Sequence, residues 1–228
     1  MESMEYGKAF TFPQQETDWA KKFLIGAAIS LVPVLGSIVY GGYTLEITRR
    51  VINGDSQVMP EWSDFGDFVK KGVYALLIVL IYVLPALIFA SCLSVWPLTA
   101  GQDAPLPAIG VVVSACCGCL VVLYVIFLGL ILPAALGRLA ATGEIGPALR
   151  VNEVFALVRT KPAVYLIVGL LSLVATVLLF SIGSFIPYCG NILGFAYSQL
   201  VAAHLVGQAY KVASAESGGM APSSPATA

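Results

Sequence analysis

Three long uncharged stretches of this chain limit the fold more than any other feature. They cover residues 72–95, 108–136 and 162–210. A helix needs about 20 mostly apolar residues to cross the hydrocarbon core of a bilayer. The first two stretches suit one crossing each, whereas the third is too long and is divided at Pro187 and Gly190, because these residues end helices. We therefore expect four membrane spans, over 72–95, 108–136, 162–185 and 190–212.

The composition agrees with a chain whose solvent is lipid. Of the 228 residues, 58% are hydrophobic and 11% are charged, whereas soluble domains have about 25% charged residues. We expect a single transmembrane domain over 1–213, with the lipid bilayer as its partner, and a disordered polar tail over 214–228. The net charge of −1 provides no basic surface for nucleic acid.

The basic residues divide the connectors into two groups. The connectors at 96–107 and 185–190 have none, whereas basic residues flank the other ends of the expected spans. Because loops rich in Lys and Arg stay in the cytoplasm during insertion, we predict a multi-pass protein of the cell membrane with both termini cytoplasmic. The basic residues are Lys8, Lys21, Lys22, Arg49, Arg50, Lys70, Lys71, Arg138, Arg150, Arg159, Lys161 and Lys211.

The N-terminal apolar block, residues 23–45, does not fit a simple crossing. One crossing would put Lys22 and Arg49 on opposite faces, against the same charge rule. Pro33 and Gly36 lie near the middle of the block, and the two arms of about 13 residues, about 20 Å each, are too short to span. The sequence therefore predicts a re-entrant or interfacial helical hairpin over 18–50.

This helix break has a counterpart near the C-terminus. We interpret the two segments as repeated hairpins, in which Gly36 and Gly190 serve the turns, while Gly41 and Gly42 let helices approach closely. The residues that recur with one spacing are Pro33, Gly36, Ile38 and Tyr43, then Pro187, Gly190, Ile192 and Tyr197.

Two polar segments between the expected spans have apolar residues at helical spacing. Trp62 and Phe65 share one face of the segment 60–71, and Val154 and Val158 share one face of the segment 147–160. Both segments are predicted to be amphipathic surface helices that lie in the inner leaflet with the apolar face toward lipid.

The N-terminal third carries motifs that resemble a known family. The motifs are Tyr-Gly-Lys-Ala-Phe-Thr-Phe-Pro at 6–13, Asp-Trp-x-Lys-Lys-Phe-Leu-Ile-Gly at 18–26, Ser-Leu-Val-Pro-Val-Leu-Gly at 30–36 and Met-Pro-Glu-Trp-Ser-Asp-Phe-Gly-Asp at 59–67. With these motifs the chain resembles the bacterial and archaeal membrane proteins catalogued as domain of unknown function 4013. The likeness covers about residues 5–75 and rests on hydropathy alone beyond them. The resemblance implies an integral membrane protein of unknown role, with no catalytic residue to carry over.

Five cysteines lie toward the outer face in the predicted topology: Cys92, Cys116, Cys117, Cys119 and Cys189. Three interpretations stay open, namely small packing residues, a disulfide from Cys189 to Cys92 or Cys116 if that face is oxidising, and a metal or redox site. The metal site is the least favoured, because successive thiols on a helix point about 100° apart and do not converge on one ion.

Few polar residues lie within the expected spans. His204, the one histidine, shares the last span with Gln199 and Asn191, and an ionisable group within a membrane is a functional hypothesis by default. These three residues are the candidate intramembrane polar site. Glu46 is a candidate partner of His204, although Arg49 and Arg50, three and four residues further on, favour local ion pairs instead.

These patterns predict an all-α fold: a polytopic helical membrane protein with four full spans, an N-terminal re-entrant or interfacial hairpin and two amphipathic surface helices. We expect no enzyme and no cofactor, because the chain has no phosphate-binding loop and no Ser-His-Asp arrangement suits its one histidine. The first functional hypothesis is a non-catalytic scaffold or accessory subunit that binds other membrane proteins or itself. The alternative is a small-solute transporter or channel, since broken helices in corresponding positions of two halves often mark a binding site.

Overall fold

The computed structural model describes residues 4–99, 107–186 and 190–216, with side chains described for 4–91, 114–186 and 190–216. Every regular element in these residues is a helix, so the all-α class is confirmed for this part of the chain. The N-terminal segment forms one short helix, α1 (Lys8–Thr11), and one 3-10 turn, η1 (Phe12–Gln15).

The N-terminal apolar block folds as two helices, α2 (Trp19–Ser30) and α3 (Leu35–Asn53). The break falls at the predicted proline, and Val34 in the turn has a φ of 65°. A Cβ on Gly36 would lie 2.0 Å from the carbonyl oxygen of Ile29, so this position requires glycine. The helical break is confirmed, while α3, at 19 residues, is longer than the expected arm.

The next two helices are the longest, α4 (Phe65–Thr99) and α5 (Pro107–Thr142). The expected surface helix over 60–71 is not a separate element, because α4 begins at Phe65 and continues through Lys71 and Gly72 without a break. Residues 60–64 are irregular, and the backbone N–H groups of Asp67 and Phe68 donate to the carbonyl of Asp64 at the helix start. Two turns of the predicted surface helix therefore belong to the following span.

The expected surface helix over 147–160 is two short helices, α6 (Ile145–Leu149) and α7 (Val151–Thr160), which meet at Arg150. The apolar face of α7 does not lie open to lipid as predicted. Val154, Leu157 and Val158 are buried, because α7 packs on α5 and α9. The apolar periodicity thus reports contact with the protein itself.

The last two helices are α8 (Pro162–Gly183) and α9 (Gly190–Glu216). They pack as an antiparallel pair, and their backbones approach closely where a Cβ on Gly190 would lie 1.9 Å from the carbonyl oxygen of Gly183. Because α9 continues to Glu216, the first three residues of the expected tail are helical, and 217–228 lie outside the described residues.

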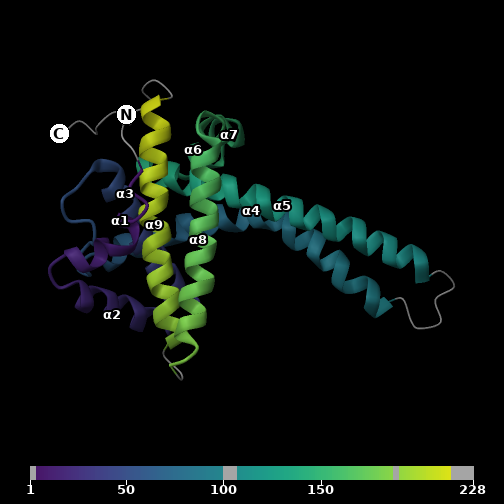
Figure 1. Ribbon diagram of the computed structural model, residues 1–228, viewed down its shortest axis with the longest axis horizontal. Helices are drawn as coiled ribbons and strands as arrows, with labels where there is room; N and C mark the ends of the chain where they lie inside the picture. The colour runs from purple at the N-terminus through teal and green to yellow at the C-terminus, as the bar shows by residue number, and fades with distance from the viewer. Residues whose placement is uncertain (1–3, 100–106, 187–189, 217–228) are drawn as a thin grey trace.

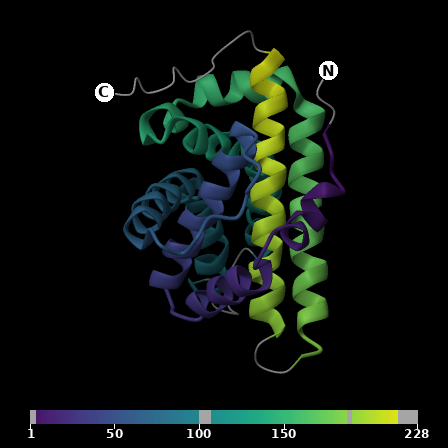
Figure 2. The same cartoon turned by 90° about the vertical axis from the view of Figure 1, so that its left-hand side faces the viewer.

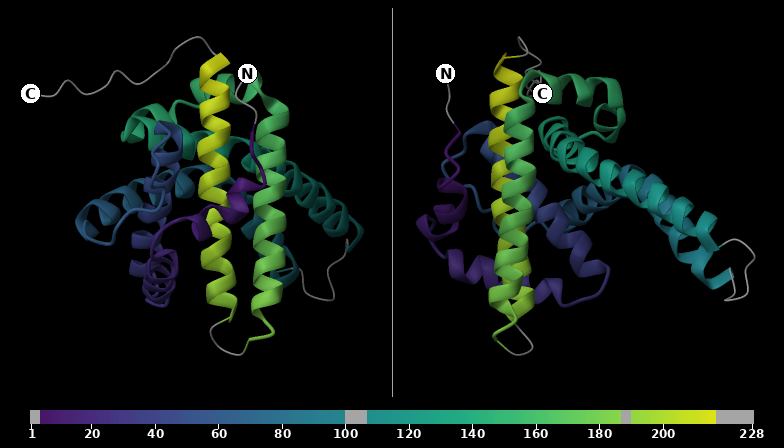
Figure 3. Two further views of the ribbon diagram at one scale, coloured as in Figure 1. Left: turned by 60° about the vertical axis from the view of Figure 1, so that its left-hand side comes forward. Right: turned by 45° about the vertical axis from the view of Figure 1, so that its right-hand side comes forward.

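The four longest described helices form two pairs that meet near one end of α8 and α9 and diverge from there (Figure 1). One pair is α8 and α9; the other is α4 and α5, which projects away from it (Figures 1 and 3). The short helices α6 and α7 lie at the joined end. Helix α3 packs on both α4 and α9, and the N-terminal segment crosses α9 (Figure 2). We call the two pairs the α4–α5 limb and the α8–α9 limb.

Three helices in the described part of the chain are long and apolar enough to cross a membrane: 65–91, 114–142 and 162–183. Only 11% of the most apolar window of the second is buried, so most of its surface needs an apolar solvent. The expected fourth span, over 190–212, is not among them. Helix α9 is the central helix of the packed protein, with Leu200, Val201 and Leu205 fully buried.

The crossing of α3 and α4 provides a test of the fold. A Cβ on Gly42 would lie 1.8 Å from the carbonyl oxygen of Phe68, which is backbone and cannot move alone. We expect Gly42→Ala to cost about 3 kcal/mol or more, at the upper end of overpacking effects, measured by thermal unfolding in detergent. Gly41→Ala is the matched control, because its Cβ meets nothing within 4 Å. Equal melting temperatures for both variants would contradict this helix crossing.

Candidate functional site

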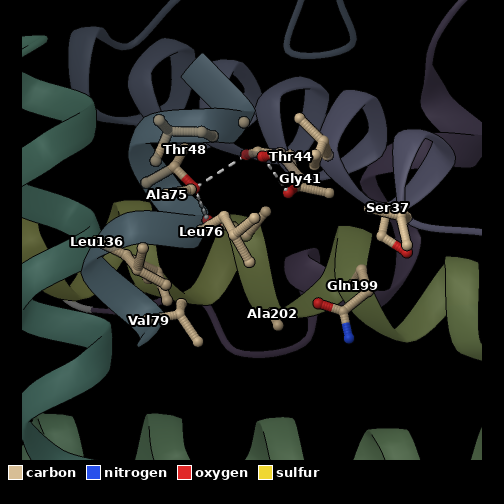
Figure 4. A pocket seen from close by; sticks show the side chains of 16 residues that line it. Ser37, Gly41, Thr44, Thr48, Ala75, Leu76, Val79, Leu136, Gln199 and Ala202 are labelled. Atoms are coloured by element: carbon tan, nitrogen blue, oxygen red, sulfur yellow. Dashed lines mark hydrogen bonds between the residues drawn. The ribbon is translucent and has the colours of Figure 1, made fainter. Parts of the chain in front are cut away.

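An apolar groove of about 520 Å³ lies between α3, α4 and α9, with one residue from α5. Figure 4 shows its walls: Ser37 and Thr44 come from α3, Leu76 and Val79 from α4, and Gln199 from α9. The groove lies at the level of the first candidate span, since Leu76 and Val79 fall within 65–91. We call it the α3–α9 groove.

A second hollow of about 380 Å³ adjoins the groove toward the start of α9. The two share Ser37, Gly41, Thr44 and Gln199, and the second is also lined by Asn191. The Oδ1 atom of Asn191 is buried and has no hydrogen-bond partner in the described residues. The structure therefore brings together two of the three residues of the predicted polar site, Gln199 and Asn191.

The third predicted residue, His204, lies elsewhere. It lines a polar depression formed with the N-terminal segment and the start of the 55–64 loop, which joins α3 to α4. Its ring stacks on Phe12, with centroids 4.5 Å apart, and its Nδ1 lies 3.2 Å from Nε2 of Gln208. Gln208 in turn exchanges hydrogen bonds with the backbone of Glu5. His204 thus helps to hold the N-terminal segment against α9.

Glu46 does not meet His204. Its carboxylate pairs with Lys71 at 2.5 Å, with Arg50 at 3.3 Å and with Arg49 at 3.5 Å. The local pairs with the two arginines confirm the alternative that the sequence favoured, while the contact with Lys71 comes from the neighbouring helix α4.

The predicted cysteine pair, Cys92 and Cys189, lies outside the part of the chain whose side chains the structure describes. Cys116, Cys117 and Cys119 are free thiols on α5. No group of histidine, cysteine and carboxylate side chains within the described ranges could hold a metal ion.

A buried ionic cluster that the sequence patterns did not predict lies at the start of α2. Lys22 is 5% exposed, and its ammonium group lies 2.9 Å from Glu61 and 3.8 Å from Glu16. It also donates to the carbonyl of Met59 at 3.0 Å. Glu16 accepts hydrogen bonds from the backbone N–H groups of Val58 and Met59. We call Glu16, Lys22 and Glu61 the polar latch.

The latch continues into an aromatic stack. Trp62 donates from its indole nitrogen to the carbonyl of Lys22 at 2.9 Å, and its ring stacks on Tyr43 with centroids 4.1 Å apart. Phe68 packs edge-on against both rings. The sequence pattern placed Trp62 on the lipid-facing side of a surface helix, but the residue joins the 55–64 loop to α2 and α3. The one sequence signal for this arrangement was the family resemblance, which covers most of these residues.

The polar latch also favours the ionised form of Glu61, its exposed member. A hydrogen bond from Lys22, together with the positive charge of that residue, holds the pKa of Glu61 below its usual value. Because the folded pKa is lowered, the contribution to stability is present above pH about 4.5, the ordinary pKa, and is lost as the pH falls below it.

Removing the cation of the latch should be costly. Lys22→Met leaves the Glu16 carboxylate buried without its partner, and we expect a loss of about 3–5 kcal/mol in the free energy of unfolding. The double variant Glu16→Gln with Lys22→Met should recover much of this loss, because no buried charge is then unpaired. Lys21→Met, at the exposed neighbouring position, is the control. A Lys22→Met protein as stable as the Lys21→Met protein would contradict the role of the latch. Thermal and denaturant unfolding in detergent measure these differences.

Comparison with known proteins identifies a family and adds no activity. No curated protein and no solved structure matches the chain. A family model does match, over residues 25–188, so the likeness extends well beyond residue 75, where the motifs end, and starts after the segment 6–13. This match spans more than half of the chain. The chain therefore belongs to the family described as protein of unknown function DUF4013.

Proposed function

We propose that this protein is a non-catalytic integral membrane scaffold or accessory subunit that binds other membrane proteins through its apolar helices. The observation that carries this proposal is the exposure of apolar side chains along α4, α5 and α8, which the protein itself leaves uncovered. Leu123 on α5 is 63% exposed and Leu173 on α8 is 61% exposed. Exposed apolar surface of this extent marks contact with a membrane or with protein partners.

The diverging limbs support a binding role. The α4–α5 limb extends away from the rest of the molecule (Figure 1), so its outer part has few neighbours within the chain. Only 17% of the most apolar window of the first candidate span is buried. Because lipid tails are as apolar as leucine, helices associate in membranes by close packing, and a projecting helix pair offers neighbouring helices access from several sides.

The proposed orientation places the joined end of the limbs in the cytoplasm. Ion pairs gather there: Arg138 with Glu153, and Lys161 with Glu216 at 2.6 Å. At the other end of the α8–α9 limb, Phe185 and Ile186 are exposed and uncharged. Basic residues lie at the joined end and not at the other end of this limb. Because basic loops stay in the cytoplasm, this distribution supports four crossings, with α9 as one of them, and two cytoplasmic termini.

In this orientation α2 and α3 form the re-entrant hairpin. Its turn exposes Leu31, Val34 and Leu35, an uncharged apolar tip that suits insertion into hydrocarbon. The polar latch lies at the other end of α2, where water can reach Glu61, which is 72% exposed at its side chain. Together the two ends support a hairpin that enters and leaves on the cytoplasmic side.

Cysteine labelling tests this topology. In a variant without native cysteines, Lys21→Cys and Arg49→Cys should both react with an impermeant maleimide only from the cytoplasmic side. Ser184→Cys should react only from outside. Labelling of positions 21 and 49 from opposite faces would overturn the re-entrant hairpin, because the first apolar block would then cross the membrane.

Photo-cross-linking in native membranes tests the scaffold. A photoreactive residue at Leu123 or Leu173 should give a discrete protein adduct of constant stoichiometry, whereas one at the buried Val168 should give none.

The alternative, a solute transporter, is favoured by one observation, the unpaired amide oxygen of Asn191 beside the groove. Lipid adducts alone at both exposed positions, with solute flux in proteoliposomes that falls on Asn191→Ala or Gln199→Ala, would replace the scaffold by the transporter.

A further inference from the structure

We propose that the α3–α9 groove binds one molecule of a neutral glycerolipid with a free hydroxyl group, the chemistry of a diacylglycerol, with an acyl chain along the groove and the glycerol at Asn191 and Gln199. This goes beyond the scaffold role and does not depend on it. Three observations carry the inference: where the groove opens, the charge of its lining, and the hydrogen-bonding groups that stay unused.

The groove opens on surface that faces hydrocarbon. Leu76, in its wall, is 46% exposed and belongs to a candidate span. Val34, at the apolar turn between α2 and α3, is 69% exposed and lines the same groove. A molecule can therefore enter sideways from the bilayer, and the apolar part of the walls (Figure 4) suits an acyl chain.

The lining of the groove and of the adjoining hollow contains no charged residue. A phosphate group drawn into this space would lose its hydration without a cation to replace it, which is costly in an apolar setting. The ligand part inside the groove must be neutral. This excludes the headgroup of a phospholipid from the polar end of the site and favours a lipid whose polar part is glycerol and its esters.

The polar groups of the site are not all occupied. Thr44 donates its hydroxyl to the carbonyl of Gly41 at 2.9 Å, and Tyr40 donates to the carbonyl of Ala196 at 2.7 Å. Among the described residues Asn191 Oδ1 is a buried acceptor without a donor, and leaving such a group unpaired costs free energy. A lipid hydroxyl supplies the missing donor.

Gln199 complements that contact. Its amide lies beside both hollows, and Figure 4 shows it at the groove near Ser37. A side-chain amide offers two N–H donors and one acceptor, so it can donate to an ester carbonyl. A diacylglycerol carries both the hydroxyl and the esters, whereas a free fatty acid or a hydrocarbon lacks one or both.

Gly41 keeps the site open. It lines both hollows, and a Cβ at this position would meet no atom within 4 Å. A large side chain there would fill the groove without a backbone clash. Gly118 on α5 provides a matched control, because its Cβ position is equally free and it lines neither the groove nor the adjoining hollow.

The test uses the full chain in phosphatidylcholine vesicles with a diacylglycerol that carries a photoreactive group in its acyl chain. We expect adducts on α3 and α9 that unlabelled diacylglycerol displaces and phosphatidylcholine does not. Gly41→Leu should reduce these adducts about tenfold, equivalent to about 1.4 kcal/mol, and Gly118→Leu should leave them unchanged. Adducts spread over the faces of α5 and α8 that lie away from the groove, and that Gly41→Leu does not reduce, would overturn the proposal.

A second variant separates the hydroxyl contact from the fold. Asn191→Ala removes a buried unpaired atom, so it should not lower the melting temperature of lipid-free protein. The wild type should prefer diacylglycerol over its acetylated form about fivefold, the worth of one hydrogen bond, and Asn191→Ala should lose this preference. Equal binding of both lipids by the wild type would overturn the assignment of the hydroxyl. Cross-links from the groove to a second copy of the chain would overturn the lipid as the occupant of the groove.

Discussion

The contact of α3 with α4 is the constraint on which the other helices depend. Their backbones meet without intervening side chains: Gly42 faces the carbonyl of Phe68, and Gly72 faces the carbonyl of Ile38. This approach fixes where the α4–α5 limb starts. Because adjacent residues of a helix point about 100° apart, Gly41 faces another direction and leaves the α3–α9 groove open. Two neighbouring glycines of α3 thus do different things: Gly42 allows the close contact with α4, and Gly41 leaves space for the groove.

The polar latch holds the same crossing from the loop that precedes α4. Lys22 pulls the 55–64 loop onto α2 through Met59 and Glu61, and Trp62 then stacks on Tyr43 of α3. The loop can therefore enter α4 at Phe65 in one position. A buried ion pair contributes little net stability, since desolvation offsets the attraction. Its effect here is to select one path for the chain between α3 and α4.

Patterns within one segment were predictable from the sequence, and contacts between distant segments were not. The long uncharged stretches predicted α4, α5 and α8, and Pro33 with Gly36 predicted the break before α3. Apolar spacing around Val154 predicted a helical face, but spacing alone does not distinguish lipid from protein as the covering surface. The helical spacing predicted around Trp62 was wrong, because residues 60–64 are irregular and α4 begins at Phe65. The partners of His204 and Lys22, Phe12 and Glu61, lie far along the chain. Asn191 and Gln199 came together because they lie two turns apart on one helix.

The groove bears on the choice between a scaffold and a transporter. A path for a polar solute needs hydrogen-bonding groups along its whole length. In the described part of the chain the polar side chains of the groove are Ser37, Thr44, Thr48 and Gln199, the hydroxyl of Thr48 already donates to the carbonyl of Ala203, and the α4 wall is apolar. A permanently bound lipid would pair with these polar side chains and cover the apolar wall. It would add apolar contacts between α3, α4 and α9, where the protein leaves a hollow of about 520 Å³. Filling that space would stiffen the joint between the two limbs, which is what a scaffold that holds partners at a fixed geometry requires.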